Sequence, residues 1–130
     1  MENNNYVLIA DDVPSNRTVL ETMLSHLGLG FVSVEDGQQA FDRIQRGPLP
    51  ALIFMDCQMP VMDGYAATEK INEWQRSSGK PRIPIIGLTA GVFEGDRNHG
   101  LAVGMDDFLS KPLEPDELQA ILKKWLPAGV

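Results

Sequence analysis

Residues 51–64 read ALIFMDCQMPVMDG, and the rest of the chain can be interpreted outward from this stretch. Five residues suited to a buried strand, 51–55, run directly into the carboxylate of Asp56. Pro60 and the Asp63-Gly64 pair then break the chain into a polar loop. Because burying an unpaired carboxylate costs several kcal/mol, we expect Asp56 to lie at the rim of the core, within reach of a cation. Asp56 is therefore the first candidate for chemistry.

A strand followed by a helix is predicted five times along the chain. Short apolar runs predict strands at 6–10, 31–34, 51–55, 85–88 and 107–109. Apolar residues at helical spacing predict helices at 14–27, 37–46, 67–74, 93–103 and 118–125, with a polar connection at 77–84. The fourth of these helices is the weakest, because Gly95 and Gly100 both lower its helix propensity.

Five such units in succession predict an α/β fold, a doubly wound parallel sheet with helices on both faces. Crossovers between parallel strands are right-handed in nearly all proteins, which leaves few topologies. No linker, composition shift or internal repeat interrupts the pattern, so residues 1–130 are expected to form a single domain.

Reactive side chains follow several of the predicted strands. Asp11 and Asp12 come after the first strand, Asp56 after the third, Thr89 after the fourth and Lys111 after the fifth. Each has a structural alternative, namely a helix cap, a turn residue, a strand residue or a solvated lysine. Ligands of such sheets bind beyond the carboxyl ends of the strands, and the shared position favours one site there.

Three acids in one crevice require a cation or a shifted pKa, because two carboxylates about 4 Å apart repel by roughly 4 kcal/mol at an effective dielectric near 20. Mg²⁺ is the ion that prefers a few carboxylates together with water and phosphate oxygens. Lys111 adds a positive charge for an incoming anion. The set suits phosphoryl transfer in which Asp56 attacks in line and the Thr89 hydroxyl bonds a phosphoryl oxygen.

Composition excludes several other classes. The chain has 11 Lys plus Arg against 18 Asp plus Glu, a net charge of -7, so most of its surface repels nucleic acid. Cys57 is the single cysteine and cannot close an internal disulfide. No apolar run approaches the roughly 20 residues of a membrane span, and no signal-peptide pattern is found. We expect a cytoplasmic chain without nucleic-acid or membrane contact.

Four motifs together resemble the receiver domains of two-component response regulators. They are LIADDVPSNR at 8–17, FMDCQMPVMDGYAAT at 54–68, PIIGLTAG at 84–91 and GMDDFLSKP at 104–112. The resemblance implies a flavodoxin-like fold with strand order 2-1-3-4-5, in which the first and third strands are neighbours. It also implies that Asp56 is the phospho-acceptor. Asp12, Asp56 and the Gln58 backbone carbonyl would bind Mg²⁺ directly, and Asp11 through water.

The resemblance further implies a conformational switch and a modest catalytic activity. The Thr89 hydroxyl would move onto the phosphoryl group and Phe108 would turn inward, reshaping the face of the fourth helix, fifth strand and fifth helix. Such a domain catalyses its own phosphorylation and dephosphorylation but acts mainly as a signalling switch. Two departures put the phosphoryl lifetime in doubt: Gly87 stands where many relatives carry Ala, and Gly91 lacks a side chain that often tunes dephosphorylation.

The residue sequences of these motifs most resemble those of receivers in hybrid sensor histidine kinases. The implied partners are a sensor histidine kinase, a histidine-phosphotransfer protein or both. We expect them to dock near residues 14–17 and Pro112. The chain itself is expected to be a monomer or a weak dimer. Nothing after Trp125 suggests an output domain, so a receiver cut from a longer protein is favoured over a free-standing one.

Three other readings remain. An aspartyl-nucleophile phosphatase would carry a second Asp where this chain has Gln58. A flavodoxin-like electron carrier would need a phosphate-binding loop in place of Asp11 and Asp12. A degenerate receiver used only for binding is the third.

Overall fold

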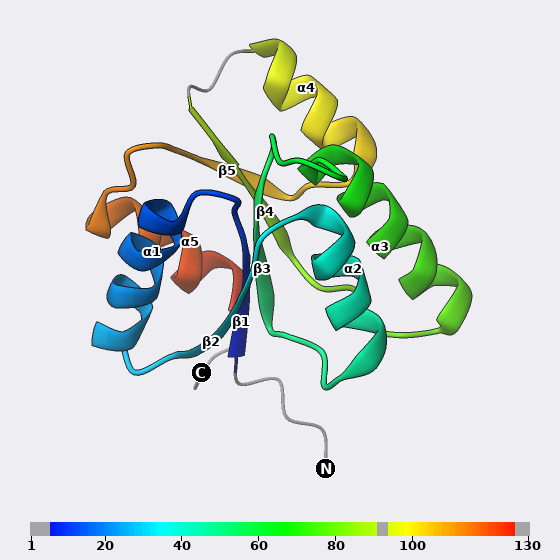
Figure 1. Ribbon diagram of the computed structural model, residues 1–130, viewed down its shortest axis with the longest axis horizontal. Helices are drawn as coiled ribbons and strands as arrows, with labels where there is room; N and C mark the ends of the chain where they lie inside the picture. The colour runs from blue at the N-terminus through cyan, green and yellow to red at the C-terminus, as the bar shows by residue number, and fades with distance from the viewer. Residues whose placement is uncertain (1–5, 91–93, 127–130) are drawn as a thin grey trace.

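The computed structural model describes residues 6–90 and 94–126, which alternate between strand and helix throughout (Figure 1). The strands are β1 (Tyr6–Ala10), β2 (Gly30–Val34), β3 (Leu52–Asp56), β4 (Ile85–Thr89) and β5 (Asp107–Ser110). The helices are α1 (Pro14–His26), α2 (Gly37–Arg46), α3 (Gly64–Ser78), α4 (Glu94–Val103) and α5 (Pro115–Trp125). The predicted α/β class is confirmed.

The strands form one parallel sheet in the order β2-β1-β3-β4-β5, as the resemblance implied. The register pairs Ala10 of β1 with Met55 of β3. The next residues along these two strands are Asp11 and Asp56, so the register brings both acids to the same edge. The order of the strands thus positions the site.

Each face of the sheet has its own hydrophobic core, because alternate residues of a strand point to opposite faces. Helices α2, α3 and α4 cover one face, and α1 and α5 cover the other (Figure 1). On β3, Ile53 and Met55 pack in the first core, whereas Leu52 and Phe54 pack in the second. Burial on both faces explains why the strand sequences are continuously apolar rather than alternating.

Local chemistry explains most element ends, and two helices are longer than predicted: α3 begins at Gly64 and α5 begins at Pro115. Pro14 occupies the first turn of α1, where its missing N–H costs nothing. Helix α3 continues through Ser77 and Ser78, which were predicted to lie in the connection, and is capped by Gly79 with φ 69°. The predicted start of the fourth helix at residue 93, and Gly91, lie outside the described residues.

Val61, in the loop between β3 and α3, has a strained backbone. Its φ is 68°, and the Met62 N–H donates to the Pro60 carbonyl at 2.7 Å, which closes a three-residue turn. A β-branched residue at positive φ is a genuine outlier. The side chain is 82% exposed, so no packing compensates for the strain.

Replacing Val61 with glycine is expected to raise the free energy of unfolding by about 1 kcal/mol. The relief of backbone strain, of order 1–3 kcal/mol, outweighs the greater entropy that glycine gives the unfolded chain. Urea denaturation of both proteins measures the difference. Val61→Ala is the matched control, since alanine keeps the Cβ atom that causes the strain and should give no comparable gain. A glycine variant less stable than the parent would refute this account.

Candidate functional site

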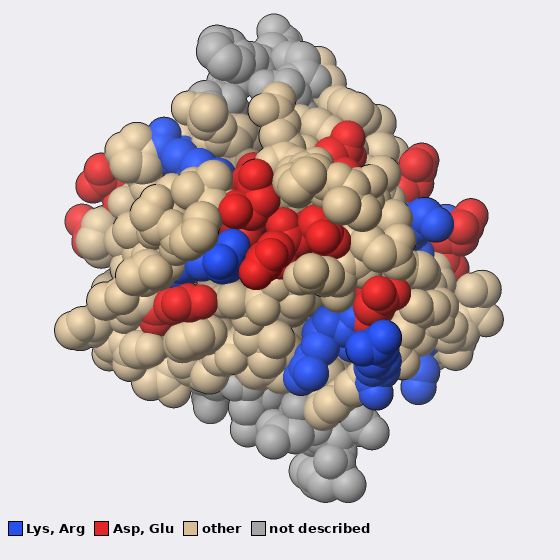
Figure 2. Space-filling model, in the orientation of Figure 1, with Lys and Arg blue, Asp and Glu red and all other residues tan. Residues whose placement is uncertain are grey.

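An open cleft of about 280 Å³ lies at the carboxyl edge of the sheet. Its walls come from the loops after β1, β3, β4 and β5 and from the first turn of α3. The lining residues are Asp12, Val13, Asp56, Cys57, Gln58, Tyr65, Leu88, Thr89, Ala90 and Lys111. Figure 2 shows Asp and Glu side chains gathered at the centre of the view, over this end of the sheet.

Three carboxylates lie close together at the cleft, two in its lining and the buried Asp11 behind them, as the sequence predicted. Asp11, Asp12 and Asp56 each offer one carboxylate oxygen, and these oxygens lie within 4.8 Å of one another. Asp11 is 1% exposed and Asp56 is 6% exposed, whereas Asp12 faces solvent. This donor set, two buried carboxylates and one open to water, fits a hard divalent cation.

The helix-capping alternative for the acid pair does not describe this structure. The N-cap of α1 is Val13, which makes no side-chain cap hydrogen bond. Asp11 Oδ1 instead accepts a hydrogen bond from the Val13 N–H at 2.9 Å, which fixes the orientation of its carboxylate toward the cleft. Asp11 is therefore oriented by the loop, and both acids are available to the cleft rather than engaged in capping.

Lys111 bridges the two buried acids. Its Nζ atom lies 3.1 Å from Asp11 Oδ2 and 3.2 Å from Asp56 Oδ2. Burial opposes the lysine charge, but the ion pairs with Asp56 and Asp11 outweigh that effect and raise the pKa of Lys111. The ammonium group is thus firmly charged at neutral pH, at the place where an anion would enter.

Asp56 is the most perturbed acid of the cleft. Burial and the negative charge of Asp11 raise the pKa of Asp56 to about 6, against the opposing effects of Lys111 and of the Gln58 N–H, which donates to Asp56 Oδ1 at 3.3 Å. The carboxylate form still predominates at pH 7. An ionised but poorly stabilised carboxylate is a competent nucleophile once a cation neutralises its surroundings.

The two residues of the implied switch lie on adjacent strands. Thr89 is buried at the end of β4 and lines the cleft. Phe108 on β5 is also buried, with its ring already inside the protein in this structure. Full burial of a Phe side chain is worth about 1.5–3 kcal/mol. The Phe108 ring thus already occupies the inward position, which the resemblance assigns to the phosphorylated state.

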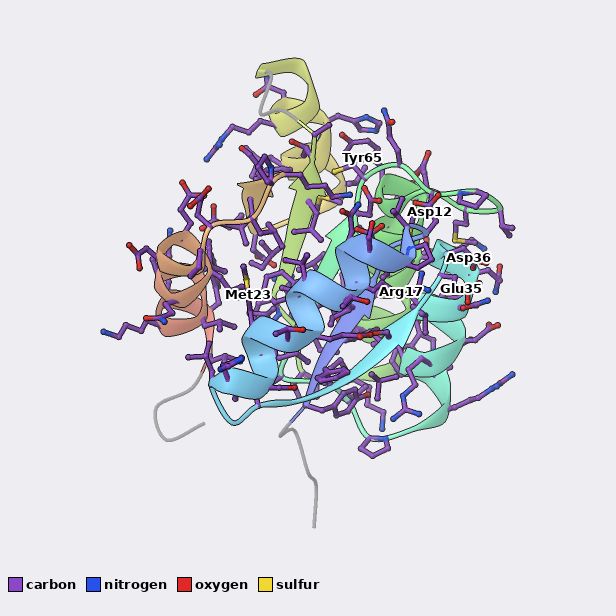
Figure 3. The ribbon with its side chains drawn as sticks, turned by 60° about the vertical axis from the view of Figure 1, so that its left-hand side comes forward. Asp12, Arg17, Met23, Glu35, Asp36 and Tyr65 are labelled. Atoms are coloured by element: carbon purple, nitrogen blue, oxygen red, sulfur yellow. The ribbon has the colours of Figure 1, made fainter. Side chains whose placement is uncertain are left out.

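Two residues near the cleft were not anticipated in these roles. Tyr65, at the start of α3, lines the cleft and stacks on His99 of α4, with ring centroids 3.9 Å apart and an interplanar angle of 13°. Figure 3 shows Tyr65 and Asp12 at the same end of the molecule. Arg17 Nη1 donates to the Asp11 backbone carbonyl at 2.8 Å. No spacing in the sequence signals the Tyr65–His99 contact, because it joins separate helices.

A family model, curated relatives and solved structures all match this chain to the same protein family. The model of the response regulator receiver domain matches residues 7–123. The sensor protein GacS of Pseudomonas syringae pv. syringae is 38% identical over 119 residues, which cover 92% of this chain. The match spans only 13% of the length of GacS.

Solved structures agree with this result. The receiver domain of the sensor histidine kinase PA1611 from Pseudomonas aeruginosa PAO1, with a magnesium ion coordinated in its active site cleft, is 42% identical with a TM-score of 0.83, covering 95% of this chain and 98% of that one. A chain in the co-crystal structure of the Saccharomyces cerevisiae phosphotransfer protein Ypd1 with the receiver domain of Ssk1 is 28% identical with a TM-score of 0.88, covering 96% and 90%.

Among residues 6–90 and 94–126, no helix combines the length and the apolar character that crossing a lipid bilayer requires.

Proposed function

The chain belongs to the family of response regulator receiver domains of two-component systems, and on this premise we propose that Asp56 accepts a phosphoryl group from a phosphohistidine. One observation carries the proposal. Asp56 is a buried carboxylate with a raised pKa, set in an open cleft between two further acids and Lys111. A carboxylate whose pKa is perturbed by burial and a charged neighbour, set in a cleft, is characteristic of a functional site.

The chain's residues have separable roles in the transfer. An oxygen of Asp56 forms the O–P bond as the N–P bond of the donor breaks, and the donor imidazole recovers a proton. Lys111 pairs with a phosphoryl oxygen once Asp56 carries the acyl phosphate, since its partner carboxylate has then changed charge and shape. The Thr89 hydroxyl, at the end of the adjacent strand, donates to another phosphoryl oxygen.

Asp12 and Asp56, with the Gln58 backbone carbonyl, would hold Mg²⁺ directly, and Asp11 would act through water. The three clustered carboxylate oxygens support this set, as does the magnesium ion in the PA1611 receiver. When bound, the ion neutralises charge on the acids and on the transferred group.

The decisive experiment is to incubate the protein with acetyl phosphate and Mg²⁺ and to measure its intact mass. We expect a gain of one phosphoryl group, mapped by peptide analysis to Asp56, and no gain when EDTA removes the metal. A degenerate receiver would show no adduct under either condition. An adduct on another residue would also overturn the assignment.

We further propose that the chain is the receiver of a hybrid sensor kinase located in the cytoplasm and that it passes its phosphoryl group to a histidine-phosphotransfer protein. The relatives in sensor kinases and the Ypd1 complex of a neighbour support this reading. A free-standing receiver is the alternative. Gln58, at the position where an aspartyl phosphatase has its second acid, disfavours that enzyme class.

The first helix is the proposed docking surface for the donor. Arg17, within the docking region expected near residues 14–17, donates a hydrogen bond to the Asp11 carbonyl, so changing it would also disturb the cleft. Val19, one helical turn beyond Ser15 on α1, is 45% exposed and lies outside the cleft. An exposed apolar side chain on this helix suits contact with a partner helix.

Val19→Asp is expected to slow phosphoryl transfer to or from a histidine-phosphotransfer protein by about tenfold or more, because it places a charge in a desolvated contact. Labelling by acetyl phosphate should not change. Leu101→Asp on α4 is the matched control, since Leu101 is similarly exposed at 50% but on another face. Equal transfer rates for the Val19 and Leu101 variants would count against docking on α1.

A further inference from the structure

We propose that two glycines, Gly87 on β4 and Gly100 on α4, hold Phe108 in its inward position before any phosphoryl group arrives. Phosphorylation of Asp56 then leaves the face of α4, β5 and α5 unchanged, and the phosphoryl group itself is the signal that this domain passes on. The inference rests on the proposed acceptor role of Asp56, and it replaces the aromatic switch that the resemblance implied.

The first support is steric. A methyl group at Gly100 would overlap Cζ of the Phe108 ring and lie 2.7 Å from Cε1. A methyl group at Gly87 would lie 2.9 Å from both Cδ1 and Cε1. Carbon atoms in favourable contact are about 3.5–4.0 Å apart, so neither position tolerates a side chain while the ring stays inward. The ring thus occupies a slot between the sheet and α4, and the missing Cβ atoms make that slot.

The remaining sides of the slot are also closed. The buried Met105 places Sδ 2.8 Å from where a Gly87 methyl would be, so its sulfur fills the space beside the ring. On the outer side, the Arg97 guanidinium carbon lies 5.5 Å from the ring centroid, within cation–π range. Phe108 is consequently 7% exposed.

The width of the slot is fixed because the carboxyl end of α4 is tied to its neighbours. Asn72 Nδ2 on α3 donates to the carbonyls of Val103 and Gly104, each at 3.3 Å. Arg82 Nη2 donates to the same Gly104 carbonyl at 2.5 Å and pairs with Asp106 at 2.7 Å. These contacts oppose movement of the carboxyl end of α4 toward the sheet, so an outward ring would leave an apolar void behind it.

A two-state switch needs both states to lie within a few kcal/mol of each other, so that a phosphoryl group can shift their populations. Here the inward Phe108 ring is buried and contacts Met105 and Arg97, whereas an outward ring would exchange these contacts for contacts with water. An alanine at position 87, which the resemblance assigns to many relatives, would narrow the slot and bring the two states closer. Gly87 and Gly100 instead bias this chain toward one state.

Nuclear Overhauser effects between the Phe108 ring protons and the Hα protons of Gly87 and Gly100 test the inference directly. We expect these effects in the unmodified protein, with the same intensities after saturation with beryllium fluoride and Mg²⁺ as a phosphoryl mimic. Their absence from the unmodified protein, or their appearance only with the mimic, would overturn the inference. Intact mass after acetyl phosphate treatment reports separately on the acceptor role of Asp56, so the two proposals fail by different measurements.

Variants give a second test of the slot. Alanine has a higher helix propensity than glycine, so Gly100→Ala would raise the melting temperature if only the helix mattered. The slot predicts the opposite, a lower melting temperature with loss of the ring contacts, and a gain when the same change is made in a Phe108→Ala background. If Gly100→Ala does not fold, the milder Gly87→Ala is expected to lower the melting temperature and to lose the ring contacts.

Gly47→Ala is the control for these variants, since the nearest neighbour of its added methyl would be the flexible Arg43 side chain at 3.6 Å, an ordinary contact distance. A Gly100→Ala or Gly87→Ala protein that is more stable than the parent and keeps the ring contacts would refute the slot.

Discussion

The Asp56→Asn variant is expected to take up no phosphoryl group and yet to be more stable than the parent protein at pH 7 without Mg²⁺. Asparagine has nearly the shape of aspartate but offers no nucleophilic carboxylate. It also carries no charge, whereas ionised Asp56 is buried beside Asp11 and only partly offset by Lys111. The gain follows from removing a charge that the folded state disfavours.

The pH dependence of that gain has a definite sign. The pKa of Asp56 is raised from 3.8 to about 6 on folding, so its protonated form stabilises the folded state and its ionised form opposes folding. The parent protein has the full benefit below pH 3.8 and loses it as the pH rises through about 6. Each pKa unit corresponds to about 1.4 kcal/mol, so a rise from 3.8 to about 6 places the advantage of the Asn variant at about 3 kcal/mol at pH 7.

Urea denaturation at several pH values, in buffer with EDTA, measures this difference. Asp12→Asn is the matched control, because Asp12 belongs to the same cluster but faces solvent, and its replacement should give a much smaller gain. Adding Mg²⁺ should reduce the difference in the free energy of unfolding between the Asp56→Asn variant and the parent, since the ion stabilises the parent through a carboxylate that the variant lacks. An Asn variant clearly less stable than the parent at pH 7 without metal would show that the cleft is not a crowded acidic pocket.

Much of the fold was predictable because its pattern is local. Apolar runs ending in Ala10, Met55 and Leu88 predicted strands, and parallel pairing then required their carboxyl ends to share an edge. The acids after β1 and β3 were therefore expected together, and the structure places them so. The order of the strands was different: composition and periodicity leave several orders open, and only the resemblance to receivers selected 2-1-3-4-5.

What the sequence did not reveal depends on contacts between distant elements. The Tyr65–His99 stack joins α3 to α4, and nothing in the spacing of either residue marks it. Gly100 was interpreted as a weakness of a helix, whereas in the structure it makes room for a ring from β5. Glycine at this position lowers the helix propensity of α4 and at the same time makes room for the ring. Only the effect on helix propensity can be recognised from one sequence.

Replacing Lys111 with methionine is expected to destabilise the protein by about 3 kcal/mol at pH 7 without Mg²⁺. Methionine retains the length and most of the packing of lysine but removes the charge that bridges Asp11 and Asp56. Removing one partner of a buried ion pair costs about 3–5 kcal/mol, because the other charge remains buried and uncompensated. Lys111→Arg, which keeps the charge, is the control and should lose much less.

The loss in the Lys111→Met variant should itself depend on pH, in a way that identifies its cause. It should shrink at acidic pH, because the raised pKa of Asp56 lets that carboxyl take up a proton in place of its lost partner. It should also shrink above pH 10.5, where the parent loses the charge of Lys111 as the pH passes the raised pKa of that residue.

If unpaired Asp56 is the source of the loss, the same lysine change in the Asp56→Asn background should cost markedly less. An equal cost in both backgrounds would mean that Lys111 stabilises the fold through packing or through Asp11 alone. The phosphoryl-binding role assigned to the lysine would then have no support from its coupling to the acceptor.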